Sequence, residues 1–559
     1  MKTTPYLFLI SLFTALGITV LNAQEVVSDT VINRNVTVER EFRPVIQDAG
    51  KMNVYPEISV PNLTKATPQY RTTNSKPLNV DQNIHYLSAA SIRMPRLHYN
   101  EGFARVGIGT GFNTLADFAY PLFTNRDTKL DFILNHYGFF NKKAHANTQA
   151  AMKFTKQLSP FDLYAGIGGN HEFFKYYGKS YLSDMNNDLT EVDELIGGQN
   201  NIMRLNANVG LHNSEWEDGW RYAADLGYNL FHSGVNSVNE HQVNVKGGVN
   251  GEMFGNRAGI NITSSNQFYS TTTNGDVLKN YYVFSLNPYY AIERESWNLN
   301  LGLKTYFSIN KGRGFSIMPD VHFDWRFAPK YAAIYAGVTG DYKVNTISDI
   351  TRENLYIRQG VQVDDTYTPL DIFAGVKVKP FNGFLFDVFV DYKMIQNQYF
   401  FETDYSEGLV GNNELFLNVF HPIYSKANVF KLGGRISYTY YEKFNIQLNG
   451  VYSKWNVSNY DHAWYKPSWE LGMNISYKVM PSLSIYANAD FSGGRYALLK
   501  DIPVKLDAMI DINLGADYNL FKWMTVFLKI NNLINNKYDI WHGYEAQGFN
   551  LTAGAVFDF

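Results

Sequence analysis

The chain has 559 residues, of which 16% are aromatic and only 18% are charged, with a net charge of −3. A net charge this small argues against a nucleic-acid partner. The absence of cysteine excludes disulfides, thiolate metal sites and a cysteine nucleophile. The mean hydropathy is −0.26. A chain this aromatic and yet polar on average is typical of a transmembrane β-barrel, whose apolar residues occupy alternate positions.

The first 23 residues have the pattern of a secretory signal peptide. Lys2 precedes an apolar run from Tyr6 to Leu21, and Ala23 offers a small residue for cleavage before Gln24. The alternative is a membrane anchor, but this run is shorter than the roughly 20 residues that a spanning helix needs. We therefore expect the mature chain to leave the cytoplasm.

Residues 24–95 differ in composition from everything that follows. Prolines interrupt this stretch, and only residues 31–40 alternate like a strand. Pro-rich segments of this kind are extended rather than folded. We expect an extended N-terminal segment that lies in the periplasm or in the lumen of a barrel and is able to bind a partner.

Residues 96–559 are predicted to form the barrel domain, and strict alternation is evident from about residue 103. Apolar and polar residues alternate clearly in four stretches: 204–212, 483–491, 507–517 and 549–559. Because successive strand residues point to opposite faces, each stretch has one apolar and one polar face. The polar face suits a water-filled lumen.

The connections between the predicted strands alternate in length. Six short ones fall at 158–160, 254–256, 328–330, 380–383, 441–443 and 480–482. Long polar ones fall at 176–199, 344–366, 402–426, 492–505 and 532–547. Outer-membrane barrels have short periplasmic turns and long external loops. This rhythm predicts an all-β, antiparallel barrel of about 22 strands with both chain ends in the periplasm.

The C-terminal residues resemble those of a known family. Asn532-Leu533-Ile534-Asn535, followed by Lys537 and Tyr538, resembles the motif near the end of TonB-dependent outer-membrane receptors and transporters. The last strand contains Phe549, Phe557 and Phe559. It resembles the signal that the barrel-assembly machinery recognises, so that machinery and outer-membrane lipid are expected partners. The resemblance implies a transport function and a 22-stranded barrel.

The chain departs from that family at its N-terminal end. Family members carry a plug domain inside the barrel, and the stretch between Gln24 and about residue 103 is too short and too rich in proline for one. We also find no convincing TonB box. The sequence therefore predicts a plugless relative, with no inference that its transport is driven by TonB.

Polar and aromatic positions give more specific predictions. The residues expected to face the lumen are Arg204, Asp490, Asp507, Asp511 and Asp517. Aspartates in a pore select cations, or they pair with inward arginines, or they are simply part of a polar lumen. Two aromatic pairs, Phe521 with Trp523 and Trp464 with Tyr465, stand at predicted strand ends, where an aromatic girdle lies.

Evidence for catalysis or a cofactor is weak. The 12 histidines are scattered, and His171 beside Glu172 or His212 near Glu215 are most simply polar residues of the lumen or loops. The acidic stretch 184–195 has oxygen ligands at alternate positions. However, Leu189 stands where a calcium loop has glycine, so a solvated loop is the better interpretation. We expect no enzyme activity, no catalytic residue, no cofactor and no metal.

Two functions fit these observations. One is a channel or transporter, because a wide barrel without a plug would conduct. The other is a structural or assembly subunit of an outer-membrane complex, in which the N-terminal segment binds envelope proteins or fills the lumen.

Overall fold

The computed structural model describes residues 102–158, 161–184, 186–192, 195–213, 219–234, 238–271, 279–358, 360–410 and 413–559, without the side chains of 407–410. The expected signal peptide (1–23) and Pro-rich segment (24–95) lie outside the described residues. Within the described part of the chain, no helix is long and apolar enough to cross a membrane.

One continuous antiparallel sheet makes up the barrel. Its strands are β1 (Phe103–Gly109), β2 (Asn113–Thr124), β3 (Thr128–Phe139), β4 (His145–Leu158), β5 (Phe161–Lys175), β8 (Gln199–Asn213), β9 (Arg221–Ser233), β10 (Val238–Met253), β11 (Asn256–Thr271), β12 (Tyr281–Glu293), β13 (Trp297–Ile309), β14 (Phe315–Ala328), β15 (Ala332–Lys343), β16 (Thr366–Val378), β17 (Phe384–Val410), β18 (Asn413–Tyr440), β19 (Phe444–Val457), β20 (Trp469–Met480), β21 (Leu483–Gly493), β24 (Met509–Phe521), β25 (Met524–Asn531) and β28 (Asn550–Asp558).

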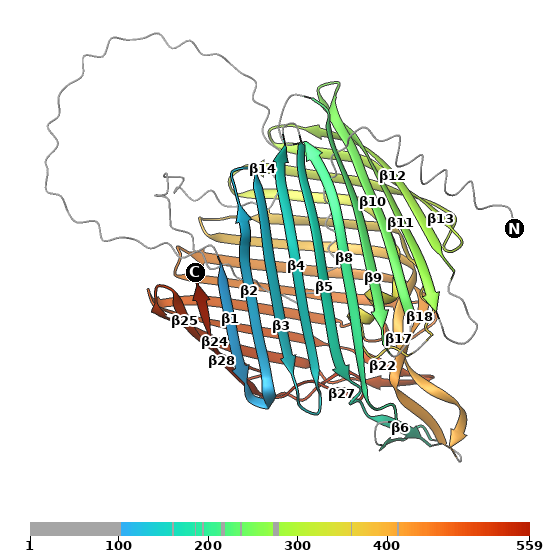
Figure 1. Cartoon of the computed structure of the whole chain (residues 1–559). Coiled ribbons are helices and arrows are strands. Elements are labelled where there is room, and N and C mark those ends of the chain that lie inside the picture. The colour runs from blue at the N-terminus through green and yellow to red at the C-terminus, as the bar shows by residue number, and fades with distance from the viewer. Residues whose placement is uncertain are drawn as a thin grey trace, which may run out of the picture. The chain divides into compact units, whose positions relative to one another are not determined.

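The first and last strands close the barrel. β1 pairs with β28 along its whole length, from Phe103 opposite Asp558 to Gly109 opposite Thr552, and the two lie side by side in Figure 1. The sheet has 24 strands, and the short β6 (Ser180–Ser183) and β7 (Leu189–Val192) belong to a loop, which leaves 22 in the wall. The predicted count is confirmed. Closure leaves no unpaired edge to face hydrocarbon, where each lost hydrogen bond costs several kcal/mol.

The two faces of the wall differ as the alternation predicts. On β13, Leu301 and Leu303 are exposed apolar residues, whereas Lys304 on the other face pairs with Asp320 of the next strand. Ile485 and Leu514 are likewise exposed on late strands. An apolar outer face and a polar inner face make this a wall suited to lipid outside and water inside.

The six short connections predicted from the sequence all lie at one end of the barrel, together with both ends of the barrel domain. The six predicted short turns fall between consecutive strands, as expected. The turn Phe254–Gly255 illustrates their geometry, because both residues have positive φ, as a two-residue type I′ hairpin requires. Phe521 and Trp523 flank another of these turns with their rings stacked 5.5 Å apart, where an aromatic girdle was expected.

The long connections gather at the opposite end (Figure 1). One prediction about them is wrong: residues 402–426 are not a loop. β17 and β18 continue as one hairpin of 27 and 28 residues, far beyond the roughly 9–11 that a membrane strand needs. β6 adds to this hairpin by pairing with residues 414–416 of β18. The composition of residues 402–426 resembles that of a loop because this part of β17 and β18 extends beyond the lipid-facing wall. Neither of its faces therefore needs the apolar side chains that contact lipid.

Candidate functional site

The loops at the long-loop end pack on one another and form a hydrophobic core of their own. We call this assembly the cap; it comprises the described residues of five connections (176–198, 344–365, 458–468, 494–508 and 532–549) and the outer part of the β17–β18 hairpin (398–426). The largest buried side chains of the barrel belong mostly to it and to the strand ends beneath it: Phe174, Ile202, Ile347, Ile350, Phe400, Phe401, Phe416, Phe420, Leu499 and Tyr544. This core joins five connections and the hairpin from around the barrel rim.

Aromatic rings hold the most distant parts of the cap together. Tyr356 and Tyr544 stack with ring centroids 3.5 Å apart, and the Tyr544 hydroxyl donates to the Asn418 carbonyl oxygen at 2.7 Å. The rings of Phe420 and Trp541 lie 5.7 Å apart. Stacked and edge-to-face aromatic pairs stabilise a contact beyond the area that they bury. The cap is therefore a packed structure and not a set of independent loops.

The predicted girdle pair Trp464 and Tyr465 belongs to this core, so that prediction is wrong. Both residues are almost fully buried, in the connection between β19 and β20, and the Tyr465 ring lies 4.7 Å from that of Trp541. Burial raises the pKa of Tyr465 above its ordinary value. A girdle residue needs lipid contact, and these two have protein on all sides.

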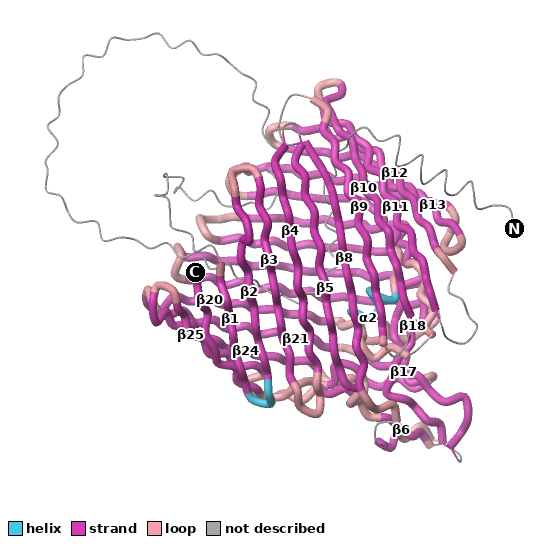
Figure 2. The backbone as a smooth tube through the Cα atoms, viewed as in Figure 1, coloured by secondary structure: helices cyan, strands magenta, loops and turns pink. Residues whose placement is uncertain are grey.

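The connection 344–365 contains the short helix α2 (Ile347–Glu353), which lies among the loops at this end (Figure 2). Its first turn is held from the barrel wall: the backbone N–H groups of Ile347 and Ser348 donate to the Glu240 carboxylate of β10, at 2.8 and 3.3 Å. Thr346 caps the same turn by accepting from the Asp349 N–H at 2.9 Å. A carboxylate at a helix N-terminus satisfies donors that the helix leaves unpaired.

Arg204, one of the residues predicted to face the lumen, also holds α2. It donates to Glu172 of β5 at 2.7 Å, to Asn170 at 3.1 Å and to the Thr351 hydroxyl at 3.3 Å. Arg204 and Glu172 are 6% and 5% exposed. The sequence offered Arg204 as a partner for the lumenal aspartates, but its acidic partner is Glu172, and it also contacts α2 through Thr351.

The other end of α2 is fixed by Glu353. Its carboxylate accepts from Lys466 at 2.6 Å and from the Tyr399 hydroxyl. Burial alone would raise the pKa of Glu353, but the ammonium of Lys466 outweighs it and the pKa lies below its ordinary value. α2 therefore contacts β8, β10 and β17. Because β10 and β17 stand seven strands apart in the wall, a segment that touches both lies across the mouth of the barrel.

A further ion cluster ties this connection to the extended hairpin. Arg358 donates to Asp404 at 3.1 Å, and His421 lies between Asp404 and Glu402, at 3.4 and 3.3 Å. Burial lowers the pKa of His421, but the two carboxylates outweigh that effect and raise the pKa above its ordinary value. Ile357 also forms a bridge to Phe420. The connection is anchored both to the wall and to the hairpin.

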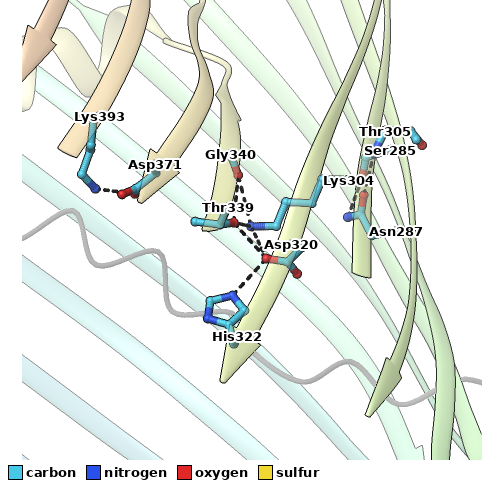
Figure 3. A network of polar contacts seen from close by, with 10 residues as sticks. All are labelled: Ser285, Asn287, Lys304, Thr305, Asp320, His322, Thr339, Gly340, Asp371 and Lys393. Atoms are coloured by element: carbon cyan, nitrogen blue, oxygen red, sulfur yellow. Dashed lines mark hydrogen bonds and ion pairs between the residues drawn. The ribbon is translucent and has the colours of Figure 1, made fainter. Parts of the chain in front are cut away.

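Below the cap, one side of the lumen carries ion pairs (Figure 3). Lys304 pairs with Asp320 at 3.2 Å, and His322 lies 3.1 Å from the same carboxylate. Two strands further on, Lys393 pairs with Asp371 at 2.7 Å. Because acidic and basic groups alternate from β13 to β17, this side has no strong field of one sign.

Neutral amides and hydroxyls line other parts of the inner face. Asn229 of β9 donates to Gln242 of β10 at 3.1 Å, and Gln242 donates to Ser265 of β11 at 3.2 Å. Asn170 and Asn147 make a similar contact at 2.6 Å. The lumen thus combines ion pairs with amides, a detail that was not predicted.

The predicted lumenal aspartates occupy different places. Asp490 of β21 and Asp511 of β24 are directly opposite each other in the register, on the face away from Ile485. Asp517 lies on the same strand as Asp511, opposite Ser484. Asp507 lies apart from them, because β24 begins only at Met509, and its backbone carbonyl accepts from Arg495 in the cap. The alternation extended the predicted strand too far toward the N-terminus.

The candidates for catalysis or metal binding have structural partners. Glu172, which the sequence pairs with His171, instead accepts from His145 and Arg204. His212 lies 3.5 Å from Asp162. In the acidic stretch, the Asp184 carboxylate accepts from its own turn, from the N–H of Asn186 and of Asp188. Among the described residues, no group of three or more potential ligands is placed to hold a metal ion.

The three phenylalanines of the expected assembly signal lie around β28. Phe549 directly precedes the strand and is exposed. The Phe557 ring lies 6.2 Å from Trp523. Phe559 exchanges two backbone hydrogen bonds with Gly102, at 2.8 and 3.0 Å. Their role as a signal stays a prediction.

Comparison with known proteins identifies solved structures with a similar fold. No protein-family model and no curated protein matches the sequence. Among solved structures, a chain of the FpvAI–pyocin S2 complex is similar, with a TM-score of 0.63 at 12% identity over 83% of this chain and 70% of that one. The ferripyoverdine receptor of the outer membrane of Pseudomonas aeruginosa gives 0.61 at 12% identity, over 83% and 72%. The ferric-catecholate import receptor Fiu of E. coli K12 gives 0.60 at 11%, over 82% of each.

These neighbours are TonB-dependent siderophore receptors of the outer membrane. The fold is therefore a transmembrane β-barrel of the outer membrane, with the 22 strands and the short-turn and long-loop ends already described. Identity this low shows the fold alone and leaves the function to be argued from the site.

Proposed function

We propose that the protein is an outer-membrane transporter related in fold to TonB-dependent receptors, in which the chain's own loops close the external mouth. The observation that carries the proposal is the cap: α2 is anchored to β8, β10 and β17, and its Ile347 and Ile350 are buried in the core of the cap. A wide barrel conducts unless something occludes it. Passage then requires that the cap loosen.

A polar lumen beneath the cap supports transport. Ion pairs and amides leave hydrogen-bonding groups along the wall that a hydrated solute can exchange for water.

Conductance of the mature protein in a planar lipid bilayer tests the proposal. Three forms are compared: the full mature chain, a form with residues 345–364 replaced by a short Gly-Ser linker, and a form lacking residues 25–95. We expect the full chain to be closed and the linker form to conduct many times better. A linker form that folds, as judged by its heat-modified gel mobility, and still does not conduct would contradict the proposal.

The second function is a structural or assembly subunit, in which the N-terminal segment binds envelope proteins or fills the lumen. The extended hairpin of β17 and β18 favours it, because it presents strands beyond the wall. Under this alternative, the full chain co-purifies with other envelope proteins in fixed stoichiometry. If only the form without residues 25–95 conducts, the N-terminal segment and not the cap occludes the lumen.

A further inference from the structure

An apolar groove lies on the outside of the barrel wall, separate from the cap and the lumen. Its volume is about 460 Å³ and its lining consists of Trp297 and Leu299 of β13 with Phe323 and Trp325 of β14. Trp297 is directly opposite Trp325 in the register, and Leu299 opposite Phe323. Four large side chains on two adjacent strands thus form the groove without a contribution from any loop.

The groove opens toward lipid. Its residues share the alternation of Leu301 and Leu303, which are exposed on the apolar face, whereas Lys304 and Asp320 occupy the inner face. Trp325 itself is 44% exposed. In a membrane, the acyl chains of lipids contact such a surface.

The position of the groove along the strands indicates which leaflet of the membrane it faces. Trp297 is the first residue of β13 and Trp325 is three residues from the end of β14, so the groove lies at the short-turn end. Both ends of the barrel domain lie at that end, which is periplasmic in barrels of this class. The lipids of the periplasmic leaflet of an outer membrane are phospholipids. Tryptophan favours the depth at which chains meet headgroups.

A charged group stands where a headgroup would be. Arg294 lies three residues before Trp297 and is exposed. It donates to the backbone carbonyl of Glu293 and to the Asn256 side chain, at 2.8 and 2.9 Å. An arginine beside the mouth of an apolar groove provides N–H donors for a phosphate.

We propose that this groove is a binding site for one phospholipid of the periplasmic leaflet, with an acyl chain between Trp297 and Trp325 and the phosphate near Arg294. The four groove residues supply the affinity, because the burial of aromatic and aliphatic surface is the larger contribution.

Native mass spectrometry of the full mature chain tests this site. The protein is released from nanodiscs of phosphatidylethanolamine and phosphatidylglycerol, and the bound lipids are counted as collision energy rises. We expect the wild-type protein to keep one phospholipid after the others have left. A W297A/W325A double variant should lose that lipid at the lowest energies.

Two further variants make the outcome decisive. Trp523→Ala removes an exposed tryptophan from another short turn, whose ring stacks on Phe521 and is not among the residues that line this groove, so it should keep the lipid. Leu299→Trp fills the groove without removing an aromatic ring and should expel the lipid. The proposal is wrong if the double variant and Leu299→Trp hold the lipid as firmly as the wild type, or if the wild type holds none.

Discussion

The two ends of this barrel are built on different principles. At the short-turn end, consecutive strands are joined by a few residues, and large side chains such as Phe254 and Tyr441 are exposed at the turns. At the long-loop end, five connections and the β17–β18 hairpin bury aromatic residues in a common core, and α2 is anchored to the wall. Both ends use the same residue types, so aromatic content alone does not distinguish a membrane interface from a packed core.

The comparison of the two ends shows which contacts close the mouth of the barrel. The conformation of the turns at the short-turn end depends only on local backbone geometry. A substitution there therefore affects only its immediate surroundings. In the cap, side chains contact segments that are distant in the sequence. A single substitution there therefore weakens contacts between different parts of the barrel mouth. The four predictions below compare one end with the other, beginning with the largest effect.

Arg204→Ala should have the largest effect. It leaves the buried Glu172 carboxylate without its cation, and removal of one partner of a buried pair costs about 3–5 kcal/mol. Hydrogen exchange of residues 344–358 should become much faster. Arg105→Ala is the control, since its pair with Asp117 is partly exposed and contributes about 1 kcal/mol or less. Unchanged exchange in Arg204→Ala would show that α2 is held by other contacts.

The stability of the cap should depend on pH through His542. Burial holds the pKa of His542 at about 4, below its ordinary value of 6.5. The unfolded side chain takes up a proton near pH 6.5 and the folded one only near 4, so stability is highest above pH 6.5 and falls as the pH drops toward 4. The loss is at most ~3 kcal/mol.

The urea midpoint of tryptophan fluorescence, measured from pH 7.5 to 4, reports this loss. His542→Phe keeps the ring contact with Tyr181 and should flatten the profile. His421 acts in the opposite sense, because its raised pKa makes it stabilising below pH 6.5. A substitution of His421 should therefore steepen the acid loss. Equal profiles for the wild type and His542→Phe would contradict the assignment.

Tyr356→Leu should have a smaller effect, since it keeps an apolar side chain but removes the stack on Tyr544. Such a pair is worth about 0.5–1.5 kcal/mol beyond its buried area. The urea midpoint of the cap should fall accordingly. The control is Tyr441→Leu, which removes a ring from the exposed pair with Tyr440 at the short-turn end and should leave the midpoint unchanged.

Phe254→Ala should have the smallest effect. Phe254 is 83% exposed in a two-residue turn, and exposed substitutions usually change stability by less than about 0.5 kcal/mol. Its urea midpoint should match that of the wild type. A loss comparable to that of Arg204→Ala would mean that the short-turn end also carries a core.

The wall could be predicted from sequence because its signal is local. Alternation along each strand and the rhythm of turns and loops are properties of neighbouring residues, and they were enough for the strand count and for the positions of the six short turns. Asp507 shows the limit of that signal, since the alternation runs past the point where pairing begins at Met509. The extension of β17 and β18 was missed because its residues have no lipid-facing pattern.

The cap could not be predicted because its contacts are distant. Arg204 and Thr351 are 147 positions apart, and Tyr544 and Asn418 are 126 apart. Nothing near Trp464 and Tyr465 in the sequence distinguishes burial in such a core from a place in the girdle. Arg204 was singled out as an inward residue, but its partner α2 carries no signal beyond the N-cap residue Thr346.

The composition of the cap also sets an order of events in folding. Its core joins Phe174, from the fifth strand of the wall, to Trp541 and Tyr544, which stand just before the last strand. Contacts of such long range form only after the loop that they close has been brought together. The core is therefore complete only once the C-terminal strands have been added. A barrel that has inserted but not closed would be an open ring, and the appearance of a protected cap would mark the moment at which β28 meets β1.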